Sequence, residues 1–397
     1  MSSSFLSLTI KFFACLLFLL FYCELLIYYL VLLRCSWPQL SKLHQDFTIQ
    51  TLDKNAKPLR VLFIADPHLL NKHDGYWFDK LRREWQMYRS YQSALFLFEP
   101  NLIFFLGDLI DEGRQATNDQ WESYVKRFQL IFHHPPQTTV HVIVGNHDIG
   151  FHYTVTDGKL ERFEKSFLDS PYLTLITYEN VHFVLANSMA FEGDNCRMCA
   201  RAEHDLSIIK EKLECLEQES SHCEKYKTLY HNRELIYTHP ILLTHFPLYR
   251  LTDENCTSDN EDDLDPQRYT KQMKENYDVL SNDTTQRLLK ILKPRLVFNG
   301  HTHHYCYIEH VNDKNKRNIK EYTVPSFSWI NRNNPSFMML TITSNNEEVK
   351  KCYLPRESTV YWSYGIGFLL LVCYLLLSGK RPVCLHGFCF IMRKIRI

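Results

Sequence analysis

Long apolar runs stand near both ends of the chain, and a mixed pattern fills the region between them. Residues 12–33 are nearly all apolar, with Lys11 before the run and Arg34 after it. About 20 apolar residues cross a bilayer as a helix, whereas the apolar part of a cleaved signal peptide has only about 7–15. We therefore expect residues 12–33 to form a retained transmembrane helix.

The second apolar run covers residues 361–378, with aromatic residues at its start and Lys380 and Arg381 behind it. The tail beyond is basic and has no acidic residue. Because basic flanks remain on the cytosolic side, we expect a transmembrane helix here and a cytosolic tail over residues 379–397. With two spans, residues 1–11 are also cytosolic, and the region between the spans is lumenal.

Glu24 lies near the middle of the first apolar run. An ionised carboxylate is costly inside a bilayer, so this side chain is expected to be neutral, to face a partner helix or to mark a function. A neutral carboxyl group is the simplest of these expectations.

Between the spans, strand-like apolar runs alternate with helical patterns. We expect a polar stalk over residues 34–57 and a folded domain over residues 58–357. Expected strands are 59–65, 102–106, 139–144, 181–186, 241–244 and 296–298, and expected helices are 78–98, 120–132 and 284–292. After residue 300 the pattern is β-like up to the second span. This alternation predicts an α/β fold in which helices cover a sheet.

Charge and cysteine content narrow the class of protein. The 397 residues carry 45 basic and 45 acidic side chains, which argues against a nucleic-acid binder. The acidic stretch 253–265 is expected to be a surface loop. Asn255 and Asn282 begin glycosylation sequons, as expected for a lumenal domain.

Four cysteines lie close together in the sequence: Cys196, Cys199, Cys215 and Cys223. In an oxidising lumen such a cluster favours disulfides. The alternative is a zinc site, because the first pair has the Cys-x-x-Cys spacing. The sequence does not decide which cysteines pair.

Five of the expected strands end in polar clusters. The clusters are Asp66-Pro67-His68, Gly107-Asp108-Leu109-Ile110-Asp111, Gly145-Asn146-His147-Asp148, His245 and Gly300-His301-Thr302-His303. In open α/β sheets, ligand sites form beyond the carboxyl ends of the strands. We therefore expect the five clusters to converge on one rim.

The side chains of these clusters form a coherent set of metal ligands. The seven candidates are Asp66, His68, Asp108, Asn146, His245, His301 and His303. Oxygen and imidazole donors without a thiolate suit Mn²⁺, iron or Zn²⁺. Seven ligands are too many for one ion, so we expect two ions with Asp108 as the bridging carboxylate.

These motifs, in this order, resemble the calcineurin-like metallophosphoesterases. The resemblance covers about residues 58–357 and is closest to membrane-bound members that remove an ethanolamine-phosphate branch from mannose of GPI anchors early in the secretory pathway. Segments such as "GNHDIGFHY", "VPSFSWINRNNPSF" and "KCYLPRE" carry it. It implies a four-layer αββα sandwich, two divalent ions that are most simply Mn²⁺, a GPI glycolipid or GPI-anchored protein as substrate, and location between the endoplasmic reticulum and the Golgi.

The resemblance also assigns roles. It implies that one metal is held by Asp66, His68, Asp108 and His303 and the other by Asp108, Asn146, His245 and His301. It implies further that His147 is the catalytic histidine and that Asp111 orients it. His152 and His304 lie outside the motifs and are not expected to bind these metals. The tail ends Arg393-Lys394-Ile395-Arg396-Ile397, which departs from a double-lysine retrieval signal and leaves the compartment open.

Two other functions fit the same residues. One is a lumenal phosphomonoesterase acting on phosphoproteins or nucleotides. The other is a non-catalytic cargo-binding protein with a structural metal site, which has no need of a free His147. A polar turn at Arg332, Asn333 and Asn334 is expected either to line the substrate groove or to lie near the rim without a role in binding.

Overall fold

The computed structural model describes residues 3–40, 57–70, 76–169, 172–218, 237–257, 269–312 and 317–379. The chain divides into two compact units, one made of both ends and one made of residues 32–354. The expected cytosolic tail, the middle of the expected stalk, most of the acidic loop 253–265 and Cys223 lie outside the described residues.

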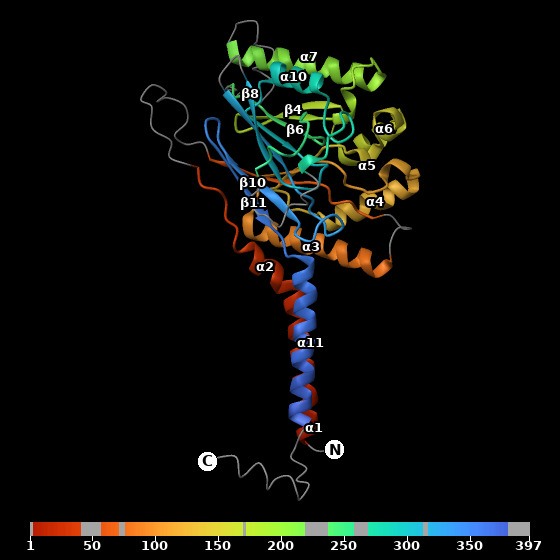
Figure 1. The fold of residues 1–397 in the computed structure, drawn as a ribbon, viewed down its shortest axis with the longest axis vertical. Helices are drawn as coiled ribbons and strands as arrows, with labels where there is room; N and C mark the ends of the chain where they lie inside the picture. The colour runs from red at the N-terminus through yellow and green to blue at the C-terminus, as the bar shows by residue number, and fades with distance from the viewer. Residues whose placement is uncertain are drawn as a thin grey trace, which may run out of the picture. The chain divides into compact units, whose positions relative to one another are not determined.

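The unit made of both ends contains two apolar helical segments. The first consists of α1 (Ser3–Phe21), the π-helical turn η1 (Tyr22–Leu26) and α2 (Ile27–Leu32), and the second is α11 (Glu357–Gly379) (Figure 1). Thr9–Leu32 and Glu357–Leu377 are long and apolar enough to cross a membrane. They are two candidate spans and indicate a membrane protein.

The two candidate spans contact each other inside this unit. The hydroxyl group of Tyr364 on α11 donates a hydrogen bond to the Glu24 carboxyl group. A Cβ atom at Gly367 would lie 2.4 Å from Leu19 Cδ1, so the missing side chain is needed for the close approach. Glu24 therefore faces a partner helix, which satisfies its polar atoms within an apolar segment.

Two sheets form the centre of the larger unit. The five-stranded sheet has the order β11-β10-β1-β2-β3, and the six-stranded sheet has the order β4-β5-β6-β7-β9-β8. The first contains β1 (Leu59–Ile64), β2 (Leu102–Phe105), β3 (Thr139–Val142), β10 (Ser336–Ile342) and β11 (Glu347–Tyr353). The second contains β4 (Leu173–Tyr178), β5 (Val181–Ala186), β6 (Ile241–Thr244), β7 (Leu296–Asn299), β8 (Cys306–Asn312) and β9 (Arg317–Thr323).

Within each sheet the strands that precede the polar clusters run parallel. β1, β2 and β3 pair in parallel, and so do β5, β6, β7 and β9. Antiparallel strands complete both sheets, with β10 pairing with β1 and β11 with β10 in one and with β4 and β8 at the edges of the other. Parallel strands have their carboxyl ends on the same side, which brings the clusters within each sheet together.

Aromatic side chains fill the space between the sheets. Phe63 of β1 stacks on Phe298 of β7 with ring centroids 3.9 Å apart, and Phe104 of β2 packs against Phe183 of β5. All four side chains are fully buried. The near-continuous apolar character of these strands follows from burial of both faces.

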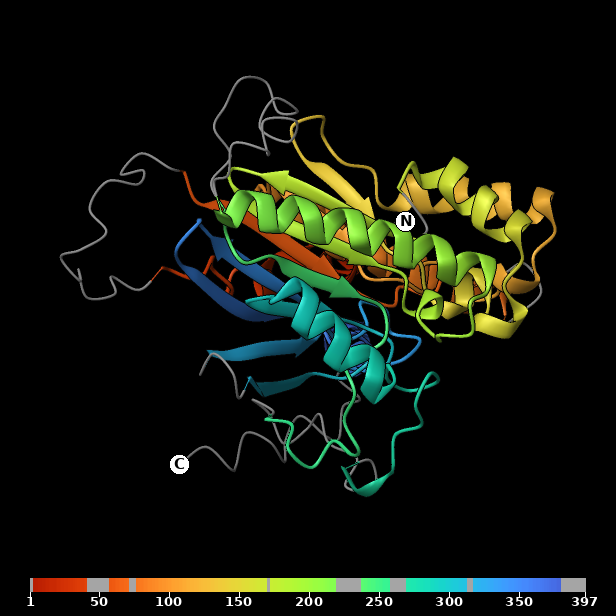
Figure 2. The same ribbon diagram turned by 90° about the horizontal axis from the view of Figure 1, so that it is seen from above.

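Helices cover the outer faces of the sheets. The described helices of this unit, including short turns in its loops, are α3 (Trp77–Phe98), η2 (Gly113–Gln115), α4 (Asn118–Ile131), α5 (Asn146–Ile149), η3 (His152–Thr154), α6 (Asp157–Phe167), η4 (Ser188–Ala190), α7 (Arg197–Gln218) and α10 (Asn282–Leu292). α3 and α4 lie on one side, whereas α7 and α10 lie over the other sheet (Figures 1 and 2). The result is the expected four-layer αββα sandwich.

Local sequence explains where individual helices begin. The hydroxyl group of Thr117 accepts the amide of Gln120, whose side chain in turn accepts the amide of Thr117, which forms a capping box before α4. The hydroxyl group of Ser281 caps α10 by accepting the amide of Thr284. Every strand and helix expected between the two spans is present, with ends that differ by at most two residues, whereas α5, α6, α7 and β4 were not predicted.

The cysteines agree with the expectation only in part. Cys35 is bonded to Cys352 and Cys256 to Cys306, so the start of the expected stalk is tied to β11. Cys215 is also disulfide-bonded. Cys196 and Cys199 are free thiols, so the expected disulfide cluster is wrong for this pair. Their sulfur atoms lie within 4.8 Å of each other, but Cys199 Sγ is directed at Asp194 Oδ1 and Cys196 Sγ accepts the backbone amide of Cys199.

Candidate metal centre

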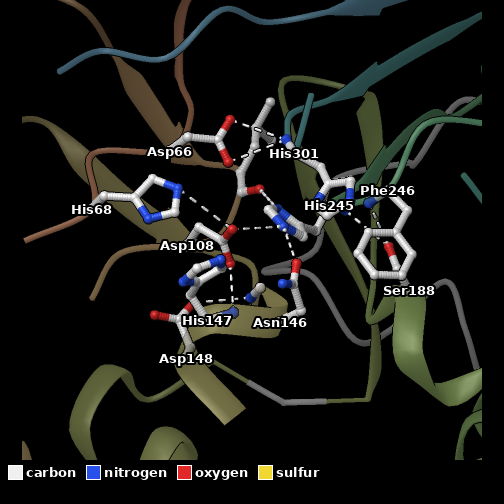
Figure 3. Close-up of polar contacts among 12 residues, drawn as sticks. Asp66, His68, Asp108, Asn146, His147, Asp148, Ser188, His245, Phe246 and His301 are labelled. Atoms are coloured by element: carbon white, nitrogen blue, oxygen red, sulfur yellow. Dashed lines mark hydrogen bonds and ion pairs between the residues drawn. The ribbon is translucent and has the colours of Figure 1, made fainter. Parts of the chain in front are cut away.

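The five polar clusters meet at one rim of the sandwich. Asp66 and His68 follow β1, and Asp108 follows β2. Asn146 begins α5 directly after β3, His245 follows β6, and the pair His301 and His303 follows β7. Figure 3 shows six of these seven side chains pointing toward a common centre. The structure thus brings together all seven candidate ligands predicted from the sequence.

Strained backbone supports this convergence. Five of the candidate ligands have positive φ angles: Asp66 (51°), His68 (46°), Asp108 (51°), His301 (70°) and His303 (62°). Residues with side chains rarely adopt this conformation, and such strain gathers at functional sites because the surrounding fold holds it in place.

One group of candidate ligands consists of Asp66, His68, Asp108 and His303. The Nε2 atoms of His68 and His303 face each other at 3.1 Å. His68 Nε2 lies 3.6 Å from Asp108 Oδ2, and His303 Nε2 lies 4.0 Å from Asp66 Oδ1. Two imidazole nitrogens and two carboxylates that face one point are suited to hold a divalent cation.

A second group combines Asp108, His245 and His301, and Asn146 joins it. His245 Nε2 lies 3.3 Å from Asp108 Oδ2 and 3.0 Å from Asn146 Oδ1. His245 Nδ1 donates to the Leu106 carbonyl at 2.7 Å, so its Nε2 faces only acceptor atoms. A proton or a cation must lie on that nitrogen. Asp108 belongs to both groups, as expected for a bridge.

His301 has a buried nitrogen without a partner. Its Nε2 donates to the Tyr277 carbonyl at 2.7 Å, while Nδ1 is buried and has no hydrogen-bond partner among the described residues. A buried imidazole nitrogen left unpaired is costly unless a ligand satisfies it. The donor set and this orphaned atom therefore fit a divalent cation.

The electrostatics of the pocket agree with this fit. Burial raises the pKa of Asp66 to about 7. Burial alone would lower the pKa of His245, but the Asp108 carboxylate outweighs it and raises the pKa to about 9. Burial, followed by the charge of His245, lowers the pKa of His301 to about 3. Burial also lowers the pKa of His303, so these two imidazoles keep free electron pairs.

His147 and Asp111 lie beside the ligand groups. His147 Nδ1 lies 2.6 Å from the Asp111 carbonyl oxygen and 3.2 Å from Asp111 Oδ1. The same Oδ1 lies 2.8 Å from His68 Nδ1, so one carboxylate orients two imidazoles. Burial works against protonation of His147, but Asp108 and the contacts to Asp111 raise its pKa to about 9. Asp111 therefore holds His147 with Nε2 free to meet a substrate.

Two glycines are required by the close approach of the loops. A Cβ atom at Gly145 would lie 2.2 Å from the Asp108 amide nitrogen, and one at Gly107 would lie 2.4 Å from His245 Nδ1. Gly107 also has a φ of 95°, which disfavours any side chain.

Four further residues hold the ligand loops, a role that the sequence pattern did not indicate for any of them. Asp148 accepts the amides of Gly145 and Ile110, and Ser188 accepts those of His245 and Phe246 (Figure 3). The remaining two hold the ligand loops through carbonyl groups: Ser326 donates to Asp66 at 2.7 Å and Arg332 to His303 at 2.9 Å. Arg332 is 7% exposed, so it supports the His303 loop.

The chain is similar to several known proteins. Purple acid phosphatase PPD1 from yellow lupin (Lupinus luteus) seeds aligns with a TM-score of 0.44 and 14% identity, covering 75% of this chain and 52% of that chain. Metallophosphoesterase 1 of Xenopus laevis is 45% identical over 94% of this chain and 89% of the relative, and that of Mus musculus is 43% identical over 89% and 85%.

The family profile described as calcineurin-like phosphoesterase matches residues 59–305. This range covers both sheets up to β7 and all seven candidate ligands. Members of this family use a binuclear metal site, and the ligand groups around Asp108 fit one. The chain therefore belongs to the calcineurin-like metallophosphoesterases and is a metal-dependent phosphoesterase.

Proposed function

We propose that the chain is a two-metal phosphodiesterase that removes an ethanolamine-phosphate branch from mannose of GPI anchors. The observation that carries the phosphodiesterase chemistry is the convergence of seven side chains with oxygen and nitrogen donors, together with the buried Nδ1 of His301, which has no partner among the described residues. The GPI substrate rests on the resemblance to GPI-processing members of the family. The 41–45% identity to metallophosphoesterase 1 proteins supports a substrate shared with those relatives.

We assign the ligands by the two groups in the structure. Asp66, His68, Asp108 and His303 would hold one cation, and Asp108, Asn146, His245 and His301 the other. Mn²⁺ is the proposed metal because the family resemblance implies it, while oxygen and imidazole donors without a thiolate also suit iron or Zn²⁺. When bound, two such cations neutralise negative charge on a phosphate group and acidify water.

His147 is the proposed general acid. Its Nδ1 is fixed by Asp111, and the side chain is 30% exposed, so Nε2 is accessible from the rim. A proton on Nε2 would pass to the leaving alkoxide of the substrate as the phosphorus–oxygen bond breaks. A proton donor placed in this way contributes about 10²–10⁴ to the rate.

We also propose that the large unit is lumenal, in the early secretory pathway. The Cys35–Cys352 and Cys256–Cys306 disulfides support an oxidising compartment. Asn255 and Asn282, which begin the two sequons, are exposed. The basic tail after the second candidate span supports a cytosolic C-terminus.

The test uses purified full-length protein, Mn²⁺ and a GPI glycolipid that carries the ethanolamine-phosphate branch, read by mass spectrometry. Asp108→Ala removes the shared ligand, and Asp119→Ala, at an exposed acid of α4, is the matched control. We expect loss of the branch with wild-type protein and with Asp119→Ala, and an unchanged glycolipid with Asp108→Ala.

The other outcomes separate chemistry from substrate. An unchanged glycolipid together with hydrolysis of a generic phosphodiester would remove the GPI assignment and leave the diesterase. Faster hydrolysis of a phosphomonoester than of any diester would instead favour the monoesterase.

A further inference from the structure

A second cluster of metal-binding side chains lies outside the candidate metal centre. His152, Asp194, Cys196 and Cys199 each offer one ligand atom, and these atoms all lie within 4.8 Å of one another. We propose that this cluster is a structural zinc site that fixes the loop carrying His147. His152 lies outside the motifs of the candidate metal centre and would bind a separate ion here.

The two thiols are set apart from the other lumenal cysteines. Among the described residues between the candidate spans, Cys196 and Cys199 are the free cysteines, whereas the others are disulfide-bonded. Cys199 Sγ is directed at Asp194 Oδ1, 3.3 Å away, and lies 3.9 Å from His152 Nδ1. Cys199 Sγ therefore faces Asp194 and His152, and Cys196 Sγ lies within 4.8 Å of the other three ligand atoms.

The geometry around the pair is that of a metal-binding turn. Cys196 directly precedes α7 and Cys199 lies in its first turn. The amide of Cys199 donates to Cys196 Sγ at 2.9 Å, and the amide of Cys196 donates to Asp194 Oδ1 at 3.0 Å. Such amide hydrogen bonds stabilise negative charge on the ligand atoms and fix their direction.

The tautomer of His152 points to a cation. Its Nδ1 donates to the Met189 carbonyl at 2.9 Å, so Nε2 is the nitrogen left to take up a proton or a cation. That nitrogen lies 2.8 Å from Asp194 Oδ2, which is also an acceptor. Two acceptors at this distance repel unless a proton or a cation lies between them. The nearby thiols favour a cation over a simple His–Asp ion pair.

The donor types select zinc. Two thiolates, one imidazole and one carboxylate supply four ligands, the number in closed structural zinc sites. A tetrahedral zinc site places its ligand atoms roughly 3.3–3.8 Å apart, so the cluster needs only small side-chain movements. The candidate metal centre around Asp108 has no sulfur donor, so the two sites differ in the softness of their ligands.

The position of the cluster connects two parts of the candidate metal centre. His152 begins η3, directly after the α5 turn that carries His147. Asp194 and both cysteines follow η4, where Ser188 holds the His245 backbone. One ion would tie these two segments together. Zinc binding at this cluster does not depend on the proposed function. The effect of the zinc ion on turnover does rest on the proposed function.

Cobalt substitution distinguishes the two sites in the full-length protein. Co²⁺ bound by thiolate gives intense sulfur-to-metal charge-transfer absorption in the near ultraviolet, which a site of oxygen and nitrogen donors does not give. We expect about one equivalent of Co²⁺ per chain to produce this band, and Zn²⁺ to abolish it. The Asp108→Ala variant should retain the band, although it loses the metals of the other site.

Variants of the cluster residues test which side chains bind the metal. The double variant Cys196→Ser/Cys199→Ser should lose the band, and Asp194→Asn should weaken Zn²⁺ binding by about 10–100-fold. Cys373→Ser, at a free cysteine of α11, is the matched control and should behave as wild type. If the double variant fails to fold, the wild-type spectrum still shows whether a thiolate binds the metal.

Two results would overturn the proposal. The first is folded wild-type protein that takes up Co²⁺ without a charge-transfer band, which would leave a His152–Asp194 ion pair. The second is a Cys196–Cys199 disulfide in peptides from unreduced protein, which would indicate a redox pair. Neither result bears on branch removal from the GPI glycolipid, so the two proposals fail separately.

Discussion

Asp148 gives a direct test of how the loops around the candidate metal centre are held. Its carboxyl group is fully buried and accepts the amide of Gly145 at 2.9 Å and the amide of Ile110 at 3.0 Å. One side chain thus joins the loop after β3 to the loop after β2. Asn146 and His147 lie on the same turn, so their positions depend on this carboxyl group.

The expected change in the free energy of unfolding follows from these two hydrogen bonds. Asp148→Ala leaves two buried amides without their acceptor, and each unsatisfied buried group costs about 1–3 kcal/mol. We expect the free energy of unfolding to fall by about 2–6 kcal/mol. Asp148→Asn keeps one acceptor oxygen but turns an NH₂ group toward the other amide, so we expect a loss of about 1–3 kcal/mol.

The assay is thermal unfolding of full-length protein in detergent, with Asp119→Ala as the exposed control. The melting temperature should fall in the order wild type, Asp148→Asn, Asp148→Ala, and kcat should fall in the same order. Asp148→Ala within about 0.5 kcal/mol of wild type, the range of ordinary surface substitutions, would refute the reasoning.

Three further predictions concern catalysis, pH and topology. His147→Asn should lower kcat by about 10²–10⁴-fold with the bound metal unchanged; loss of metal would contradict the role of His147 as proton donor. In the metal-free site His245 (pKa about 9) is protonated at pH 7 and Asp66 (pKa about 7) is about half protonated. Metal binding must release these protons, so the Mn²⁺ affinity measured by calorimetry should rise with pH and level off above about pH 9; an affinity independent of pH would be contrary evidence. Protein from secretory-pathway membranes should shift in mass on glycosidase treatment, and Asn255→Gln with Asn282→Gln should abolish the shift; a wild-type protein without glycans would argue against a lumenal domain.

Much of the fold could be predicted because its strands are buried on both faces. Runs such as 102–106 have a strong apolar signal, and polar residues directly behind them mark the strand ends. The ligand candidates followed from that position and from residue type. α7 was missed because its apolar positions are spread among many charged ones over residues 197–218, and β4 because it is an edge strand that is only partly buried.

Other features depend on contacts between distant segments. The Cys35–Cys352 bond joins residues 317 positions apart, which no local pattern encodes. Asp148 and Ser188 act on backbone amides of neighbouring loops, and Arg332 acts on the carbonyl group of His303. The pairing of His152 with Cys196 and Cys199 likewise requires the fold to bring two loops together.

The count of bound Mn²⁺ per chain tests the central claim most directly. Full-length wild-type protein, Asp119→Ala and Asp108→Ala would be loaded with Mn²⁺, freed of excess metal and measured by elemental analysis. If Asp108 is shared by both cations, we expect two ions in wild type and in Asp119→Ala, and none in Asp108→Ala. A single ion in wild type, or two ions retained by Asp108→Ala, would contradict a binuclear centre built on this carboxylate.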